Sequence, residues 1–551
     1  MGQTVIEHLL ERLKGIGITD IFGVPGDYAF PVNDAFCTDH DFKWIGCCNE
    51  LNAAYAADGY ARIKGKAAVC TTYGVGELSA INGIAGSYAE NLPVFHIVGI
   101  PKCSVQRNGN LIHHSLGNGE FDLFHKMTQP VVCASTILTA ENTVSEVERC
   151  INTALAKKQP AYIAVPADEA IKELGCTRPH IQPEPVSDQE TLDTVIPLII
   201  EKLKKSQNAI AMVGALIGRH ELHGPMLEFI NKSGIPFTSM FMAKGTLSET
   251  HPNFIGVYNG RILDEKVQQT VESADLVISF GAIRSDINTG AFTVNLDPNR
   301  EIKVHPDRVC IGHAVYHNLL LEDVLQELGN RIENLSLPIP MTPQGLGKPT
   351  GEPDGAITAD SLYPRIEHFF APNDIIMGET GTASMGLVNA RLPEDAVFFN
   401  QTLWGSIGWA TPAAFGAALA APERRTLLLT GEGAHQMTVQ EICQFARFKL
   451  KPIIICVNND GYLIERLLCE DPYIYYNDLA QWNYSKLPEA LGMDGWFSAK
   501  VTTNRELDEA LQKAASADSG CYIEVVTEMM DGPKMARVLN EIVVKGPGWK
   551  A

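Results

Sequence analysis

The stretch TGEGAHQMTVQEICQFARFKLKPIIICVNND, residues 430–460, contains the pattern that decides the fold. An apolar run ends at Leu429 just before it, a Gly-rich turn surrounds Glu432, and a segment with helical spacing leads to a second apolar run at residues 452–457. The order strand, tight loop, helix, strand predicts two parallel strands joined by a right-handed crossover. Open α/β sheets bind ligands at the carboxyl ends of such strands, here at Glu432 and Asn459.

The side chains in these two loops favour a cation beside phosphate groups. A carboxylate at Glu432 and an amide oxygen at Asn459 suit Mg²⁺, which usually keeps substrate phosphates among its ligands. An ordinary turn is the alternative, because Gly-x-Gly and paired Asn are common in loops. Two other glycine-rich stretches do not match known nucleotide-binding motifs. GLGKPT at residues 345–350 lacks the first glycine of a Walker A loop, and GALIGRH at residues 214–220 lacks the glycine spacing of the dinucleotide-binding motif.

Composition and charge limit the classes of protein to which this chain can belong. The chain has 551 residues, 45% of them hydrophobic and 20% charged, which is typical of a globular enzyme of roughly three domains. Its formal net charge of -21 argues against nucleic acid or an anionic membrane as a partner. No apolar run approaches the length of a membrane span.

The amino terminus and the cysteines bear on the compartment. MGQTVIEHLLERL predicts an amphipathic helix with a capping box of Thr4 and Glu7, which is unlike a secretory signal. The 13 cysteines are scattered without a Cys-x-x-Cys motif, so zinc and a disulfide framework are disfavoured. A cytoplasmic protein is therefore expected.

Two segments lose hydrophobic periodicity and gain proline, at residues 176–190 and 336–355. They separate three blocks, which we predict to be domains at residues 1–178, 190–336 and 356–551. Each block alternates short apolar strands with helical patterns, for example AAVCTTY in the first, LVISFGA in the second and TLLLTG in the third. This alternation predicts α/β layers in every block.

Several polar residues of the first and third blocks are candidates for catalysis. Asp27 follows a strand in FGVPGD, and Glu50 begins a helical stretch of small residues in ELNAAYAADGYAR. His113 and His114 lie in a loop rich in Asn and Gly, and imidazole exchanges protons near neutral pH. Glu465 follows the proposed metal loop in NNDGYLIER. Taken singly, each has an ordinary explanation as a turn residue, a helix-start charge or a solvated side chain.

Taken together, these motifs resemble the thiamine-diphosphate-dependent 2-oxo acid decarboxylases, which include pyruvate, indolepyruvate and branched-chain 2-oxo acid decarboxylases. The resemblance extends over essentially the whole chain, through FGVPGDY, ELNAAYAADGYAR, HHSLG, LWGSIGW, APERR and NN-x-GY-x-IE. It implies a pyrimidine-binding, a middle and a diphosphate-binding domain, each α/β with a largely parallel sheet flanked by helices. It also implies two cofactors, thiamine diphosphate and Mg²⁺.

The resemblance assigns the residues that bind these cofactors. Glu432, the Asn459 side chain and the Gly461 carbonyl are the expected Mg²⁺ ligands. The family usually has Asp at the position of Glu432, so loop movement or a shifted ion must absorb one extra methylene. The other expected contacts to thiamine diphosphate are Val75, Asn82, Thr382, Ala383, Gly405, Ile407, Gly433, Ala434 and Ile464.

The resemblance also assigns catalytic roles. Glu50 is expected to hydrogen-bond the aminopyrimidine, so that its imino form takes up the thiazolium C2 proton. Asp27, His113, His114 and Glu465 are the candidates for the later proton transfers. Asp27 is expected to orient His114, and Glu465 to lie near the departing carboxylate.

Two positions bear on the size of the substrate. Pyruvate-specific relatives narrow their pocket with a Trp and a Tyr, and Ser384 and Ile287 align with these residues. The smaller side chains favour branched, medium-chain or aromatic 2-oxo acids over pyruvate, with Met385 and Leu468 as further lining. A residue from segment 535–544 could refill the space.

Two other functions stay open at this stage. One is a thiamine-dependent carboligase resembling acetolactate synthase, against which the His113–His114 pair and Glu465 argue. The other is a cofactor-binding protein without activity, for which Glu432 is the single reason. The resemblance further implies a homo-oligomer, with a dimer as the minimal unit and a tetramer as the expected assembly, that acts on a small-molecule 2-oxo acid.

Overall fold

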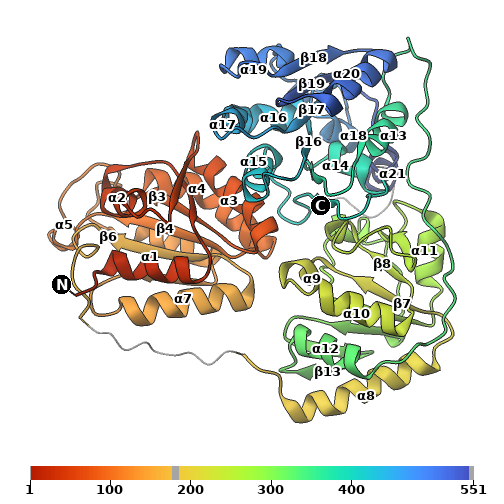
Figure 1. The fold of residues 1–551 in the computed structure, drawn as a ribbon, viewed down its shortest axis with the longest axis horizontal. Coiled ribbons are helices and arrows are strands. Elements are labelled where there is room, and N and C mark those ends of the chain that lie inside the picture. Colours follow the sequence, from red (N-terminus) through yellow and green to blue (C-terminus); the bar gives the residue numbers. More distant parts are fainter. Residues whose placement is uncertain (1, 176–184, 545–551) are drawn as a thin grey trace. The chain divides into compact units, whose positions relative to one another are not determined.

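The computed structural model describes residues 2–175 and 185–544, and these residues form three sheets (Figure 1). The chain divides into two compact units. The first comprises Met1–Pro185, Pro412–Ala421 and Gln440–Gln444, and the second Val186–Thr411, Pro422–Val439 and Phe445–Ala551. Over the described ranges, no helix is long and apolar enough to cross a bilayer.

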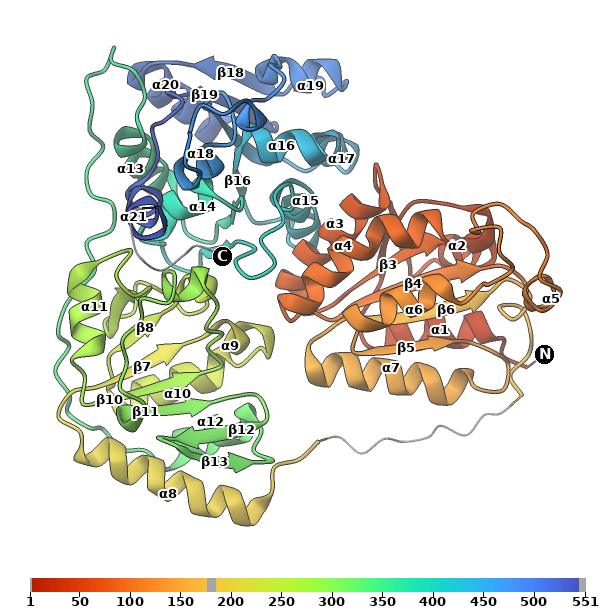
Figure 2. The ribbon, with the colours of Figure 1, turned by 180° about the vertical axis from the view of Figure 1, so that it is seen from behind.

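The sheet of the first unit is entirely parallel, in the order β2-β1-β3-β4-β6-β5. Its central strands are buried along their whole length, because helices α1 and α7 cover one face and α3 and α4 the other (Figures 1 and 2). The predicted capping box of Thr4 and Glu7 begins α1 and is confirmed. The bounds are β1 Asp20–Gly23, β2 Lys43–Gly46, β3 Ala67–Thr72, β4 Val94–Ile100, β5 Ala134–Ile137, β6 Ala161–Pro166, α1 Val5–Gly15, α3 Glu50–Lys64, α4 Val75–Ala89 and α7 Thr143–Lys157.

The second unit contains a mixed sheet in the order β13-β12-β11-β10-β7-β8-β9. Five strands are parallel, and β12 and β13 add an antiparallel edge. Helices α8, α10 and α12 pack together beside it. The bounds are β7 Ala209–Val213, β8 Phe237–Ser239, β9 Phe254–Val257, β10 Leu276–Phe280, β11 Glu301–Val304, β12 Arg308–Ile311, β13 Ala314–His317, α8 Gln189–Lys205, α10 His223–Ser233, α11 Glu265–Glu272 and α12 Leu321–Arg331.

The third sheet is parallel, in the order β15-β14-β16-β17-β19-β18. The neighbouring strands β14, β16 and β17 therefore end at one edge, at Gly378, Gly431 and Asn458. The bounds are β14 Ile375–Gly378, β15 Val397–Phe399, β16 Thr426–Gly431, β17 Ile453–Asn458, β18 Phe497–Val501, β19 Cys521–Val526, α13 Ala359–Phe369, α14 Thr382–Leu387, α15 Ala410–Ala420, α16 Glu432–Thr438, α17 Ile442–Arg447, α18 Leu463–Leu468, α20 Asn504–Ser516 and α21 Lys534–Val543.

The strand-helix-strand order of residues 430–460 is confirmed, with one difference. We expected a tight loop between the first strand and the helix, but α16 begins directly at Glu432 with Gly431 as its N-cap. The helix therefore starts with a carboxylate, which the positive end of its dipole stabilises. The three sheets confirm the predicted class of three α/β domains with largely parallel sheets.

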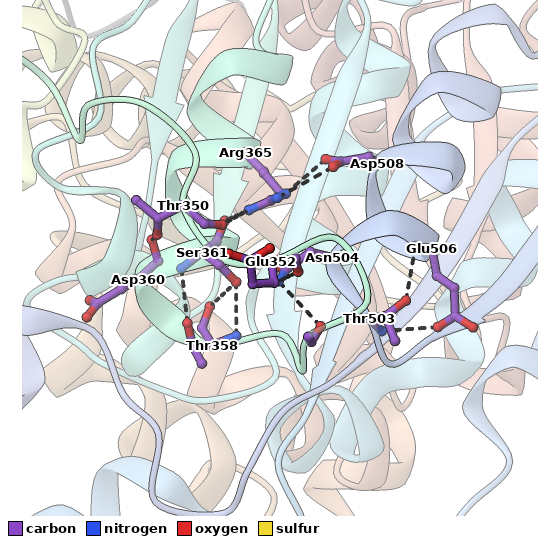
Figure 3. Close-up of polar contacts among 11 residues, drawn as sticks. Thr350, Glu352, Thr358, Asp360, Ser361, Arg365, Thr503, Asn504, Glu506 and Asp508 are labelled. Carbon is purple, nitrogen blue, oxygen red and sulfur yellow. Dashed lines mark hydrogen bonds and ion pairs between the residues drawn. The ribbon is translucent and has the colours of Figure 1, made fainter.

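A connecting segment, residues 336–355, runs between the second and third sheets without a helix or strand. Its end is fixed to the third sheet's helices by side chains that hold its backbone carbonyls (Figure 3). Arg365 donates to the Thr350 carbonyl at 2.6 Å and forms an ion pair with Asp508 at 2.9 Å. Asn504 donates to the Glu352 carbonyl at 2.9 Å. A segment without regular hydrogen bonds is thereby held in one path.

Candidate active site

Three oxygen-bearing groups converge where β16 and β17 end. The backbone N–H groups of Asn459 and Gly461 donate to Glu432 Oε1, at 3.0 and 2.9 Å. One terminal atom of the Asn459 amide lies 2.9 Å from the Gly461 carbonyl oxygen and 3.1 Å from Glu432 Oε1. With its nitrogen at this position the amide donates to both oxygens, and with its oxygen there it completes a set of three oxygens.

The spacing of this set suits a small divalent cation. Adjacent oxygens around an octahedral Mg²⁺ with bonds of 2.0–2.1 Å are about 2.9 Å apart. The 2.9 and 3.1 Å separations at Asn459 match this value. A 180° turn of one amide therefore converts a hydrogen-bonded set into three cation ligands, and the residues fit Mg²⁺ despite the extra methylene of Glu432.

Burial makes Glu432 a weaker acid than an exposed glutamate. Its side chain is 2% exposed, and desolvation raises its pKa to about 7, against the opposing effect of the N–H groups of Gly461 and Asn459. The neighbouring Gly461 has φ 146°, and a Cβ there would lie 2.5 Å from the Asn477 carbonyl oxygen. Glycine is thus required for the Gly461 carbonyl to occupy this place.

A small cavity of about 50 Å³ lies beside the three oxygens. A Cβ at Gly433 would lie 2.6 Å from the Tyr462 ring, so this position excludes a side chain and its backbone stays uncovered. Bare backbone at a helix start favours phosphate binding, because its N–H groups point outward. The cavity is lined by Glu432, Asn459 and Gly461 together with the predicted cofactor contacts Thr382, Ala383, Ile407, Gly433, Ala434 and Ile464.

A second cavity of about 290 Å³ adjoins the first, and Thr380 and Gly381 line both. The predicted substrate residues Ile287, Ser384 and Met385 lie on its wall, together with Gly405 and others that we did not predict. These others are Phe241, Asp286, Asn400, Gln401, Thr402, Leu403 and Trp404. The structure does not place Leu468 here. That side chain is half-buried against the main apolar core.

Glu379, which follows β14, was not among the predicted site residues. Its side chain is 1% exposed and accepts hydrogen bonds from the backbone of Ala410 at 3.2 Å and of Gly408, and from the Thr430 hydroxyl. Burial raises its pKa to about 8. Glu379 thus ties the loop at residues 403–409, which carries Gly405 and Ile407, to the central strands. The sequence feature that could have identified Glu379 is its position as a single carboxylate directly after the apolar run IIMG.

In the first unit, Glu50 begins α3. The N-cap residue Asn49 accepts from the backbone of Asn52 at 2.8 Å, which fixes the helix start. Partial burial raises the pKa of Glu50. A Cβ at Gly76 would lie 3.3 Å from Glu50 Oε1, so the glycine lets the start of α4 approach this carboxylate closely.

The other predicted cofactor contacts of this unit are on α4. Val75 is its first residue and has an exposed side chain. Asn82 donates to the Tyr55 hydroxyl at 3.0 Å. Both residues are therefore placed on the helix that approaches Glu50.

Asp27, His113 and His114 lie together, but not in the predicted pairing. We expected Asp27 to orient His114. Instead, His113 Nε2 lies 2.7 Å from Asp27 Oδ2, whereas His114 Nδ1 is 4.0 Å from Asp27 Oδ1. The two rings are inclined at 76°, and His114 has a left-handed backbone with φ 62°, so the neighbouring side chains leave the loop in different directions. Tyr28 stacks on His113, with ring centroids 4.9 Å apart.

The candidate residues form one set in each unit. The first unit contains Asp27, Glu50, Val75, Asn82, His113 and His114. The second contains the cation ligands and both cavities, with Glu465 exposed on the first turn of α18.

Comparison with known proteins agrees with this division. Three regions match thiamine pyrophosphate enzyme families: the N-terminal TPP binding domain at residues 3–126, the central domain at 196–330 and the C-terminal TPP binding domain at 379–525. The solved structure of a thiamine diphosphate-dependent 4-hydroxybenzoylformate decarboxylase from Rhodococcus jostii RHA1 shares the fold. Its TM-score is 0.76 with 21% identity, over 95% of this chain and 99% of that chain.

Two curated relatives are closer in sequence. An alpha-keto-acid decarboxylase from Mycobacterium leprae is 36% identical over 99% of this chain and 98% of the relative. Pyruvate decarboxylase isozyme 3 from Saccharomyces cerevisiae is 38% identical over 92% of both chains. Identity at this level over the full length, together with the three matched domains, shows that the chain belongs to the thiamine-diphosphate-dependent 2-oxo acid decarboxylase family.

Proposed function

We propose that this enzyme converts branched, medium-chain or aromatic 2-oxo acids to aldehydes and CO₂ in preference to pyruvate. The observation that carries this preference is the cavity of about 290 Å³ with Ser384 and Ile287 on its wall. Ser384 Oγ donates to the Gly381 carbonyl at 3.2 Å, so a short side chain, already hydrogen-bonded, lies at this position. Phe241 and Met385 add apolar surface suited to a hydrocarbon or aromatic substituent.

Thiamine diphosphate, when bound, supplies the electron sink that makes loss of CO₂ possible. Glu432, the Asn459 amide oxygen and the Gly461 carbonyl would hold Mg²⁺ against its diphosphate. The N–H groups of bare backbone at Gly433 and Ala434 would bind the phosphate oxygens. Gly405 and Ile407 would contact the remainder of the cofactor from the loop that Glu379 holds.

The ionisable groups of the first unit, together with Glu465 of the second, would move the protons. Glu50 would give and take a proton, and burial raises its pKa above that of an exposed glutamate. The contact of 2.7 Å between Asp27 and His113 would fix the orientation of that imidazole. His114 and Glu465 complete the set of groups proposed to exchange protons with substrate and product.

The proposed assembly is a homo-oligomer in the cytoplasm, with a dimer as the minimal unit and a tetramer as the full assembly. The cysteines support this compartment, since none that the described ranges include is joined in a disulfide.

The decisive experiment is aldehyde formation by the purified protein with thiamine diphosphate and Mg²⁺. The panel comprises pyruvate, 2-oxoisovalerate, 2-oxohexanoate, phenylpyruvate and indolepyruvate, compared by kcat/KM. Higher values for the larger acids are expected. A preference for pyruvate would reject the proposed specificity, and condensation products without free aldehyde would favour a carboligase.

The pocket should narrow when Ser384 is replaced by a large side chain. In the variant Ser384→Trp, the ratio of kcat/KM for phenylpyruvate to that for pyruvate is expected to fall about tenfold, because the indole occupies cavity volume that the larger acid needs. Ser384→Ala is the matched control and should leave the ratio nearly unchanged. An unchanged ratio in Ser384→Trp would show that the acids bind elsewhere.

The acidity of Glu432 should make Mg²⁺ binding depend on pH. With a pKa of about 7, the carboxyl is increasingly protonated below neutrality, and a proton then competes with the cation. The apparent Mg²⁺ affinity is expected to fall about tenfold per pH unit below about pH 7 and to level off above it. The measurement is a Mg²⁺ titration of the protein with thiamine diphosphate at pH 5.5, 6.5 and 7.5. Glu432→Gln removes this titrating group, so equal slopes in both proteins would contradict the assignment.

A further inference from the structure

A third cavity, of about 420 Å³, borders α14, as the substrate cavity does. It is bounded by residues 262–264, by the connecting segment at residues 345–350 and by helices α13, α14 and α21. Among residues 2–175 and 185–544, Met385 alone lines both this cavity and the substrate cavity, and the cavity beside the metal ligands shares none of these lining residues. It is therefore a separate site with one wall in common with the active site.

The wall formed by the connecting segment is held in place. The backbone N–H of Leu346 donates to Glu367 at 2.8 Å, and His368 Nε2 lies 3.0 Å from the Gly347 carbonyl oxygen. Arg365 holds the Thr350 carbonyl at the end of this wall (Figure 3). A Cβ at Gly345 would lie 2.2 Å from Glu367 Oε1, so only glycine permits the path. These contacts within the chain fix the path of the segment and so define this wall of the cavity.

The polar groups of the cavity favour an anion. Lys348 and Lys534 both line it, and within the described part of the chain neither ammonium group has a carboxylate partner. The two carboxylates of the lining are already engaged. Asp264 caps α11 by accepting from the backbone of Lys266 at 2.8 Å, and Asp360 pairs with Arg537 at 2.9 Å. Because Arg537 neutralises Asp360, the two lysines face one remaining carboxylate, Asp264, and in a chain of net charge -21 this positive excess at one cavity is a local exception.

The first turn of α21 adds to this positive character. Lys534 is the first residue of this ten-residue helix, and its N-cap, Pro533, makes no side-chain capping bond. The first backbone N–H groups of α21 therefore remain available beside the two lysines. The rest of the lining is largely apolar, with Ile262, Leu263, Tyr363, Met385 and Met535.

We propose that this cavity is a second ligand site, which binds a small organic anion with an apolar body. The anionic head would lie at Lys348 and Lys534, and the hydrocarbon or aromatic body against Leu263, Tyr363 and Met535. Carboxylate and phosphate heads share this chemistry, since an ammonium group binds either as a point charge.

The site is connected to the catalytic centre through α14. The Tyr363 hydroxyl donates to the Thr382 carbonyl at 2.9 Å, and the ring is packed so closely that a Cβ at Gly386 would lie 2.0 Å from it. A ligand against Tyr363 and Met385 would therefore press on the helix that carries Thr382 and Ser384. This part of the proposal rests on the proposed function, and it predicts that occupancy changes kcat/KM for the 2-oxo acid.

The test uses the full-length protein and 4-phenylbutyrate, a carboxylate without the 2-oxo group. Isothermal titration, which needs no catalytic activity, should detect binding. The double variant Lys348→Gln, Lys534→Gln should weaken it at least tenfold. The matched control, Lys202→Gln with Lys449→Gln, removes two exposed lysines of the same unit and should leave it unchanged. Phenyl phosphate compares the two kinds of head group, and 4-phenylbutylamine, with a cationic head, should not bind.

Kinetics with saturating thiamine diphosphate and Mg²⁺ give the second readout. The probe should change kcat/KM for phenylpyruvate at least twofold in wild type and not in the double variant. Absence of heat in the titration, or equal binding by wild type and the double variant, would overturn the site. Binding that depends on the lysines without a kinetic change would overturn the connection through α14. Binding that depends on the lysines in a protein inactive on every 2-oxo acid would separate this site from the failure of the proposed function.

Discussion

Replacing Glu50 by Gln is expected to lower kcat for aldehyde formation about 10³-fold, which is within the range of a lost acid-base group. The amide nearly matches the carboxyl in shape and leaves the start of α3 intact, but it neither takes up nor releases a proton. Glu50 suits the lost role because partial burial raises its pKa, which favours the protonated form relative to an exposed glutamate. The measurement is kcat on the preferred 2-oxo acid at saturating thiamine diphosphate.

A separate readout distinguishes loss of proton exchange from loss of the cofactor. The dissociation constant for thiamine diphosphate, followed by tryptophan fluorescence, should change less than tenfold in Glu50→Gln. Glu141→Gln, which removes an exposed carboxylate of the same unit, should retain wild-type kcat. A kcat within fivefold of wild type in Glu50→Gln would remove Glu50 from the proton path.

The sequence predicted the parts of the site that follow directly from strand ends. Glu432 and Asn459 come after apolar runs of the length expected for buried parallel strands, so the order of elements alone places them at one sheet edge. Gly461 and Gly433 were assigned by resemblance, and the structure gives the physical reason: a Cβ at either position would collide with its neighbours. These assignments depend on the path of the backbone, and local sequence patterns predict that path.

What the sequence could not predict depends on side-chain direction and long-range packing. His113 and His114 are adjacent in the chain, and no local pattern indicates which ring approaches Asp27. Leu468 was expected to line the substrate pocket, but it is the last residue of α18 and its side chain is half-buried against the main apolar core. Glu379 supports the site because its partners, Ala410 at the start of α15 and Thr430 on β16, come from elements far from it in the chain. Such convergence is a tertiary property and has no signature in spacing.

Replacing Glu432 by Gln is expected to weaken Mg²⁺ binding about 100-fold, the upper end of what the loss of a supporting group at a metal site costs. Gln keeps the length of the side chain and an oxygen that can accept from Asn459 and Gly461, so the variant should stay folded. It removes the charge, which is what draws the cation to a set otherwise made of an amide and a carbonyl. The measurement is the Mg²⁺ concentration for half-maximal activity at pH 7.5.

Two further variants distinguish the effect of the charge at position 432 from the effect of the length of the side chain there. Glu509→Gln, an exposed carboxylate on α20 of the same unit, should bind Mg²⁺ as wild type does. Glu432→Asp keeps the charge but withdraws it by one methylene, and its half-maximal Mg²⁺ concentration is expected to stay within tenfold of wild type. The reason lies in the retained charge and in Asn459, whose amide oxygen and nitrogen exchange places by a 180° turn. If Glu432→Asp were as impaired as Glu432→Gln, the position of the carboxylate rather than its charge would control the ion. If neither variant changed the Mg²⁺ requirement, the three oxygens would not be the metal site.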